Sequence, residues 1–299
     1  MRGPFAPCLS AVLPAVAIAL TFAAPAAHAD PASRRPAAAL RIAVAAMMSP
    51  AETVAAYREL VEYIGEGLGR PVQFKQRRTY QEVNDMLGTG EVDLAFLCSG
   101  AYVHAQRQYG VKLLAVPLMH GSPFYRSYMI VSADSGVKSV LDLRGKRFAY
   151  TDRLSATGYL YPVYAVLQAG GYPTTYFAGT MFTRGHDNSI EAVAEGIADA
   201  AGVHSAVYDR LETGGSPLIP RTRIIQRSPP FGSPPVVVPR SLDRGLKTAL
   251  RTLLLGMSDD PRGRSILGKL EIERFVRGDP GLYGGVRDML QVVEGATTR

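Results

Sequence analysis

A corner between a predicted strand and a predicted helix brings hydroxyl groups and backbone amides together. The segment TDRLSATGYLYP, residues 151 to 162, places Ser155, Ala156 and Thr157 at this corner. Free amides at a helix N-terminus attract an anion through direct hydrogen bonds and through the helix dipole. By itself the corner indicates an ordinary serine or threonine cap, and an oxyanion grip is the alternative.

Two histidines follow later strands at the same predicted sheet edge. His186 lies in GHDNSI, where Asp187 or Asn188 is expected to cap the next helix, and His204 follows a buried strand. Either histidine can donate to an oxyanion or can be a satisfied surface residue. From the first half of the chain, Tyr80 at a helix start is a further candidate to close over a ligand, or else a packed aromatic.

The same residues make a poor enzyme or metal site. Ser155, His186 and Asp187 lack a G-x-S-x-G elbow, and neighbouring His and Asp residues point apart at such a corner. The phosphate-binding and dinucleotide-binding glycine patterns are absent. The histidines also lack metal-ligand spacing. We therefore predict no catalytic residue, no metal and no cofactor.

Composition predicts a folded protein that does not bind nucleic acid. The 299 residues are 47% hydrophobic and 20% charged, which excludes a disordered chain. The formal charge of +7 is scattered, and residues 75 to 78 (KQRR) form the longest basic cluster. A nucleic-acid binder usually carries a basic stripe with aromatic residues beside it.

The N-terminus reads as an export signal. Residues 1–29 contain Arg2, an apolar stretch from 9 to 24 and a small-x-small cleavage pattern at 27–29. Cys8 precedes the apolar stretch, so no lipobox is present. We expect a soluble periplasmic protein that starts at Asp30, with a flexible leader over 30–38.

The rest of the chain alternates strands with helices, which predicts mostly parallel sheets. In the first block the expected strands are 40–46, 72–74, 92–97 and 111–118, with helices from about 50–68, 80–87 and 101–108. Ser49 and Glu52 are expected to form a capping box at the start of the first helix. In the second block the expected strands are 147–150, 176–182 and 198–203, with helices 158–169 and 189–196. Residues 213–235 break the pattern with six prolines, and the helices 242–257 and 261–270 follow, with a short helix near the end.

These elements predict two open α/β lobes with a ligand cleft between them. Lobe 1 is expected to comprise residues 39–127 plus 236–299, and lobe 2 residues 128–235. The two crossings, near 125–131 and near 235–239, would form a two-stranded hinge.

Three segments carry a family resemblance. Residues 91–105 (EVDLAFLCSGAYVHA), 124–162 and 185–190 resemble the phosphate/phosphite/phosphonate-binding, PhnD-like periplasmic components of ABC transporters. The likeness covers nearly all of the chain after the signal peptide and includes DDPRGRSILGKLEIERFV near the C-terminus. It implies the type 2 periplasmic-binding-protein fold, a two-lobed clamp that closes on a phosphorus oxyanion.

By position, the resemblance also implies the binding residues. The oxyanion would be gripped by the 155–157 corner and by His186, while Tyr80 and Tyr125 would line the cleft. Phosphonate binders carry an aspartate, facing the amine of an aminoalkyl ligand, at the position of His204. A histidine does not complement an ammonium group as a carboxylate does, so the chain departs from the family there.

We therefore expect a monomeric solute-binding protein that delivers a small phosphorus oxyanion (phosphate, phosphite or a simple phosphonate) to an ABC permease. The alternatives are a ligand sensor that partners a membrane kinase and a periplasmic hydrolase. The sequence has no feature that separates transport from sensing, and no nucleophile-base pair favours hydrolysis.

Overall fold

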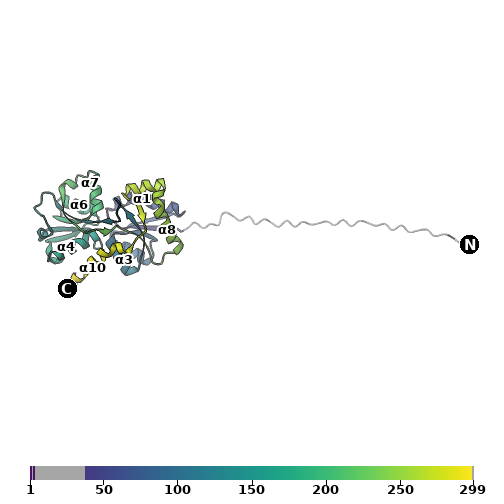
Figure 1. The fold of residues 1–299 in the computed structure, drawn as a ribbon, viewed down its shortest axis with the longest axis horizontal. Helices are drawn as coiled ribbons and strands as arrows, with labels where there is room; N and C mark the ends of the chain where they lie inside the picture. The colour runs from purple at the N-terminus through teal and green to yellow at the C-terminus, as the bar shows by residue number, and fades with distance from the viewer. Residues whose placement is uncertain (2, 4–37, 298–299) are drawn as a thin grey trace. The chain divides into compact units, whose positions relative to one another are not determined.

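The computed structural model of the protein describes residues 1, 3 and 38–297. The predicted signal peptide and all but the last residue of the predicted leader lie outside the described residues, apart from positions 1 and 3. Residues 38–297 belong to the unit Pro36–Arg299, which is described below (Figure 1).

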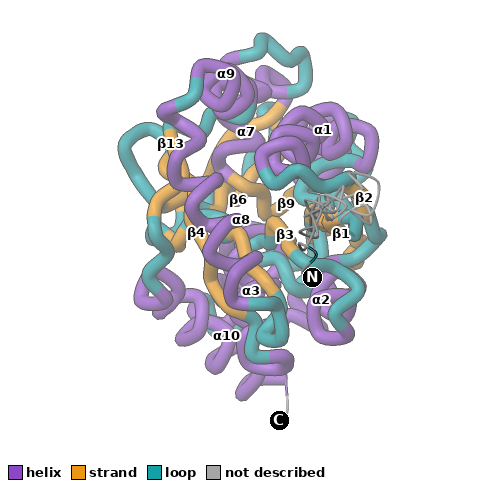
Figure 2. The backbone as a smooth tube through the Cα atoms, turned by 90° about the vertical axis from the view of Figure 1, so that its right-hand side faces the viewer, coloured by secondary structure: helices purple, strands orange, loops and turns teal. Residues whose placement is uncertain are grey.

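A six-stranded sheet, in the order β13-β4-β12-β3-β1-β2, forms the first lobe. Its strands are β1 (Leu40–Val44), β2 (Val72–Lys75), β3 (Leu94–Phe96), β4 (Lys112–Leu118), β12 (Val236–Val238) and β13 (Arg274–Val276). The helices of this lobe are α1 (Pro50–Gly67), α2 (Tyr80–Thr89), α3 (Ser99–Tyr109), α8 (Arg244–Gly256) and α9 (Pro261–Lys269). Figure 2 shows α1 and α2 on opposite sides of β1 and β3.

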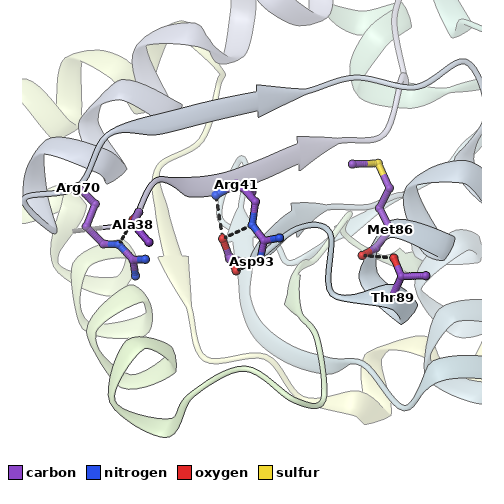
Figure 3. Close-up of polar contacts among 6 residues, drawn as sticks. All are labelled: Ala38, Arg41, Arg70, Met86, Thr89 and Asp93. Atoms are coloured by element: carbon purple, nitrogen blue, oxygen red, sulfur yellow. Dashed lines mark hydrogen bonds and ion pairs between the residues drawn. The ribbon is translucent and has the colours of Figure 1, made fainter. Parts of the chain in front are cut away.

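The N-terminal end of this sheet is held by ordinary structural contacts. The Arg41 amide and guanidinium both donate to the Asp93 carboxylate, with distances of 2.7 to 3.1 Å (Figure 3). Arg70 donates to the Ala38 carbonyl nearby. These contacts hold the N-terminal ends of β1 and β3. The strand ends that lead into the helices lie at the opposite edge of the sheet.

A five-stranded sheet, in the order β10-β6-β9-β7-β8, forms the second lobe. Its strands are β6 (Ser127–Ser132), β7 (Arg147–Tyr150), β8 (Gly179–Phe182), β9 (Ala200–His204) and β10 (Thr222–Arg227). The helical segments that matter for the site are η3 (Ala156–Leu160), α4 (Tyr161–Gln168), α6 (His186–Ala194) and α7 (Ser205–Thr213). η3 is a single π-helical turn that runs directly into α4.

The two lobes are joined by a short antiparallel pair, β5 (Phe124–Tyr125) with β11 (Phe231–Gly232). The stretch 235–239, expected to be the second crossing, instead contributes β12 to the first sheet. The helix α10 (Gly284–Thr297) also contacts both lobes, through α3 and α4. In Figure 1, α10 and α3 lie between α4 on one side and α8 on the other.

Several expected elements were wrong in detail. Both sheets are mixed rather than mostly parallel, because β12, β13, β6 and β10 pair antiparallel with their neighbours. The proline-rich stretch contains β10, an edge strand that no alternating pattern had indicated. The final helix, α10, runs over 14 residues rather than being short.

Packing links the lobes through a shared core. One hydrophobic cluster combines Ala95 and Tyr102 of the first lobe with Phe148 of the second and with Leu290 of α10. Each sheet has a further cluster on its other face. In this structure the lobes are therefore in direct contact, with the cleft closed.

Candidate functional site

The 155–157 corner follows the end of β7, as predicted. Ser155 is the N-cap residue of η3, and its Oγ accepts a hydrogen bond of 2.9 Å from the Gly158 amide. The Thr157 Oγ1 is buried and has no hydrogen-bond partner among the described residues. The amides of Ala156 and Thr157 belong to the first helical turn, where no earlier carbonyl is available to accept from them. The corner therefore caps η3 through Ser155, and it also presents the amides of Ala156 and Thr157 as donors to a ligand.

His186 is the first residue of α6 and is fully buried. Its Nδ1 lies 3.2 Å from the His204 amide and 3.0 Å from the Thr151 Oγ1. Because an amide can only donate, Nδ1 accepts, and the neutral ring carries its proton on Nε2. Nε2 is buried without a partner among the described residues. Burial holds the pKa of His186 well below its usual value, so the ring is a neutral donor.

His204 has a similar protonation state but a different environment. Its Nδ1 accepts from the Ala206 amide at 3.1 Å, which makes His204 the N-cap residue of α7 and leaves its proton on Nε2. Burial lowers the pKa of His204 to about 3. Its ring stacks on Tyr125 with the centroids 4.2 Å apart.

The first lobe contributes two tyrosines. Tyr80 begins α2, and its buried hydroxyl has no partner among the described residues. Burial raises the pKa of Tyr80 well above its usual value, so the phenol keeps its proton and can donate. The hydroxyl of Tyr125 is already engaged, 2.5 Å from the Ser99 Oγ. The Tyr80 hydroxyl can therefore donate to a ligand, whereas Tyr125 contributes to the wall of the cleft.

Hydrogen bonds across the cleft hold the lobes together. The His186 amide donates to the Met47 carbonyl at 2.9 Å. The Ser49 amide donates to both oxygens of the Asp187 carboxylate, at 3.0 and 2.9 Å. The Tyr80 amide donates to the Asp152 carboxylate at 3.2 Å. Every one of these contacts joins a helix start or strand end of one lobe to one of the other.

Two capping predictions were wrong at this interface. α6 begins at His186, and Asp187 faces Ser49 of the other lobe instead of capping its own helix. Ser49 makes no side-chain cap of α1, although a capping box was expected there. The triad considered from sequence is also absent, since Ser155 and Asp187 have these other partners and the His186 ring contacts Thr151 and His204.

Sequence reasoning missed Gly100, in the first turn of α3. A Cβ at this position would lie 2.3 Å from the Leu154 carbonyl oxygen and 2.8 Å from the Ala156 amide nitrogen. The start of α3 thus rests directly on the 155–157 corner, and only glycine permits that approach. A glycine in the first turn of a predicted helix was the available signal.

Three buried polar atoms at helix starts have no hydrogen-bond partner among the described residues: Tyr80 OH, Thr157 Oγ1 and His186 Nε2. We call these three atoms, with the amides of the 155–157 corner, the polar corner. An added Cβ at Gly158 would lie 3.0 Å from the His186 ring, which places the ring beside η3. Other buried polar side-chain atoms without a partner among the described residues are Asn84 Oδ1, Tyr102 OH, Ser135 Oγ and Ser233 Oγ.

Leaving a buried donor unpaired costs about 1 to 3 kcal/mol, so an acceptor that reaches these donors would offset that cost. The residues that supply these donors include no lysine or arginine. The described residues contain no group of three His, Cys, Asp or Glu side chains that could hold a metal ion. The polar corner is suited to an anion held by neutral hydrogen-bond donors and helix dipoles.

The family described as "ABC transporter, phosphonate, periplasmic substrate-binding protein" matches residues 42–283. The chain belongs to this family. It is 30% identical over 167 residues to the phosphate-import protein PhnD of Mycolicibacterium smegmatis, covering 52% of each chain. It is 28% identical over 154 residues to the phosphonates-binding periplasmic protein of Escherichia coli, covering 50% of this chain and 45% of the relative. The chain thus spans about half the length of these curated relatives.

Solved structures confirm the predicted type 2 fold of this phosphonate-family binding protein. A binding component of an ABC phosphonate transporter from Pseudomonas aeruginosa superposes with a TM-score of 0.81 at 20% identity, covering 87% of each chain. PhnD1 of Prochlorococcus marinus, solved with methylphosphonate, superposes with a TM-score of 0.78 at 17% identity, covering 86% of this chain and 98% of that one. Among the described residues, no helix is both long and apolar enough to cross a membrane.

Proposed function

We propose that this binding protein captures a small phosphorus oxyanion, namely phosphate, phosphite or a simple phosphonate, and delivers it to an ABC permease. The observation that carries the proposal is the polar corner, where three buried donors that have no partner among the described residues come from both lobes. The names of the curated relatives, a phosphate-import protein and a phosphonates-binding protein, support a phosphorus anion.

The donors divide between the lobes in a way that couples binding to closure. Tyr80 belongs to the first lobe, while Thr157 and His186 belong to the second. An oxyanion that accepts from all three bridges the lobes and adds to the hydrogen bonds that already cross the cleft. The ligand therefore favours the closed state by its additional affinity for that state.

The predicted site residues have different roles in this proposal. The 155–157 corner and His186 bind the oxyanion, and Tyr80 closes over it from the other lobe. Tyr125 and His204 stack on each other, and together they form the wall of the cleft beside His186. We place no residue in a catalytic role, and the matched relatives are described as binding or import proteins.

The proposal includes an export route and partners. Residues 1–29 would act as a signal peptide and 30–38 as a leader, which would release the folded lobes as a soluble periplasmic monomer. Residues 39–127 plus 236–299 and residues 128–235 stay our predicted lobe boundaries. The partner is a membrane permease. A sensor kinase in its place would make the protein a ligand sensor with the same cleft.

The proposal is tested by calorimetric titration. The protein is unfolded and refolded to remove carried-over ligand, then titrated with phosphate, phosphite, methylphosphonate and sulfate. We expect a Kd in the micromolar range or tighter for at least one phosphorus anion. Failure of all three phosphorus anions to bind would refute the proposed function.

A paired substitution assigns the binding to the polar corner. Thr157→Val removes the hydroxyl while keeping the side-chain shape, and should weaken binding of the preferred anion by about 1.5 to 3 kcal/mol, roughly tenfold to a hundredfold. Thr157→Ser keeps the hydroxyl and should bind within about threefold of the native protein. Equal affinities of the two variants would remove Thr157 from the site.

A further inference from the structure

Two residues of the polar corner hold the opposite lobe through their own backbone amides. His186 belongs to the second lobe, and its amide donates to the Met47 carbonyl of the first lobe at 2.9 Å. Tyr80 belongs to the first lobe, and its amide donates to the Asp152 carboxylate of the second lobe at 3.2 Å. In both residues, the side chain whose donor has no partner within residues 38–297 is therefore carried by a backbone that is hydrogen-bonded across the cleft.

The residue after His186 adds a stronger contact between the lobes. Both oxygens of the Asp187 carboxylate accept from the Ser49 amide, at 3.0 and 2.9 Å. Ser49 is the N-cap residue of α1, so the carboxylate also lies at the positive end of the dipole of an 18-residue helix. A hydrogen bond to an ionised acceptor contributes more than one between neutral groups. We call the pair of Ser49 and Asp187, together with the bond from His186 to Met47, the clasp.

The backbone of the second lobe leaves room for the clasp. Gly185 immediately precedes His186, and a Cβ added to it would lie 2.4 Å from the Asp187 Oδ1 and 3.2 Å from the Ser49 nitrogen. A side chain at position 185 would therefore displace the carboxylate from the Ser49 amide. α6 has no side-chain cap at Gly185, and Asp187 in its first turn faces the other lobe instead.

We propose that Asp187 is a positioning residue for anion binding, which sets how long the anion is held without contacting it. The bound oxyanion accepts from the His186 Nε2, and the clasp holds the backbone of His186 against the first lobe. Without the clasp the lobes separate more often, and each separation withdraws Nε2 from an anion that Tyr80 holds on the other side. For its ligand measurements this inference rests on the proposed function.

Asp152 holds Tyr80 in a similar way, but it is a less suitable position for a test. Its carboxylate also accepts from the Leu154 amide of its own turn, at 2.8 Å, so a substitution there would disturb the second lobe itself. The hydrogen bonds printed for the Asp187 carboxylate both come from Ser49 of the first lobe. A substitution of Asp187 therefore changes the contact between the lobes.

The test is a double-mutant cycle across the clasp, measured by calorimetry with whichever of phosphate, phosphite and methylphosphonate the native protein binds most tightly. Asp187→Ala removes the acceptor. Ser49→Pro removes the donor, and the φ of −52° at Ser49 is one that proline adopts. Each change should weaken binding about tenfold, and the double variant should lose little more, because both changes remove the same hydrogen bond. Unchanged affinities, or losses that multiply to about a hundredfold in the double variant, would overturn the inference.

Glu191→Gln is the matched control, because Glu191 is an exposed carboxylate one turn further along α6. It should bind within about twofold of the native protein. In stopped-flow measurements, Asp187→Ala should release the anion about tenfold faster and associate within about twofold of the native rate, because the clasp acts after the anion has entered. Slower association with unchanged release would overturn the inference, since the carboxylate would then act on the approach of the anion.

Hydrogen exchange of the His186 amide tests the clasp without an anion. Its acceptor, the Met47 carbonyl, belongs to the other lobe, so the amide exchanges when the lobes separate. Ser49→Pro leaves residues 186 and 187 unchanged and should speed this exchange about tenfold in the ligand-free protein. Exchange at the native rate would overturn the inference. If the native protein binds none of the three anions while Ser49→Pro still speeds the exchange, the proposed function fails and the clasp between the lobes stands.

Discussion

The two sides of His204 differ in their physical character. On one side, Tyr80, Thr157 and His186 present buried polar atoms that have no partner within residues 38–297, so an acceptor there would satisfy donors whose burial otherwise costs free energy. On the other side lies a cavity of about 90 Å³ with mostly apolar lining residues, which we call the apolar cavity. Hydrogen bonds are directional and tolerate little displacement, whereas apolar contacts depend on area. We therefore expect the polar corner to decide whether an anion binds.

The largest effect should come from obstructing closure at the polar corner. Gly100→Ala adds a methyl group that would meet the Leu154 carbonyl oxygen at 2.3 Å, so the lobes cannot approach fully. We expect a closure cost of about 2 kcal/mol, roughly 30-fold weaker binding by calorimetry, for every phosphorus anion that the native protein binds. Gly268→Ala in α9, where nothing lies within 4 Å of the added Cβ, is the control. Unchanged binding in Gly100→Ala would show that the polar corner does not depend on this close approach.

A smaller effect is expected from His204, whose amide donates to the His186 Nδ1. His204 is neutral in the folded protein because burial lowers its pKa to about 3, while the unfolded chain titrates near 6.5. Below pH 6.5 the unfolded state binds a proton that the folded state does not, so stability falls as the pH is lowered. Between pH 7.5 and 5.5 this single residue should account for about 1 kcal/mol of lost stability.

His204→Asn keeps a cap for α7 and removes this titration. Urea unfolding of the ligand-free protein at both pH values should show the native protein losing more stability than the variant. His186 is buried and neutral as well, so some pH dependence should remain in the variant. Parallel losses in the two proteins would show that the His204 ring is protonated in the folded state.

The smallest effect concerns access to the polar corner. A groove lined by Arg77, Arg78 and Arg184, with Glu82 also in its wall, joins the two lobes beside Thr79. Its positive charge should raise the association rate of an anion at low salt. Arg184→Gln should slow association about twofold to threefold in stopped-flow measurements at low salt, with little change at 0.5 M salt. Arg240→Gln, outside this groove, should have no effect, and an equal slowing there would mean that net charge alone is responsible.

Local sequence signals located the helix starts that form the site. The corner at 155–157 follows β7, His186 follows β8, and His204 is the last residue of β9. Strand ends and helix caps are set by neighbouring residues. The type 2 fold was predictable for the same reason, and from the resemblance of the long middle segment. The ligand roles of these residues remain predictions.

Contacts that depend on closure of the lobes could not be read from the sequence. The pairing of Ser49 with Asp187 joins positions 138 residues apart, and a local capping role was the more obvious expectation for each. The apolar cavity likewise combines Met48, Met119 and Val207 from separate elements. The antiparallel strand β10 was missed because the prolines around it masked the short strand pattern. The stretch of β12 was expected in the hinge, and its place in the first sheet depends on pairing with distant strands.

The buried thiol of Cys98 can report how often the two lobes separate. It is the single free cysteine among the described residues, fully buried at the start of α3, with its sulfur 3.8 Å from the Tyr125 hydroxyl. A thiol reagent can reach it only during the moments when the lobes separate or the region unfolds. The rate at which Cys98 is modified therefore measures how often the lobes separate or the region unfolds. A ligand that bridges the cleft would lower this rate.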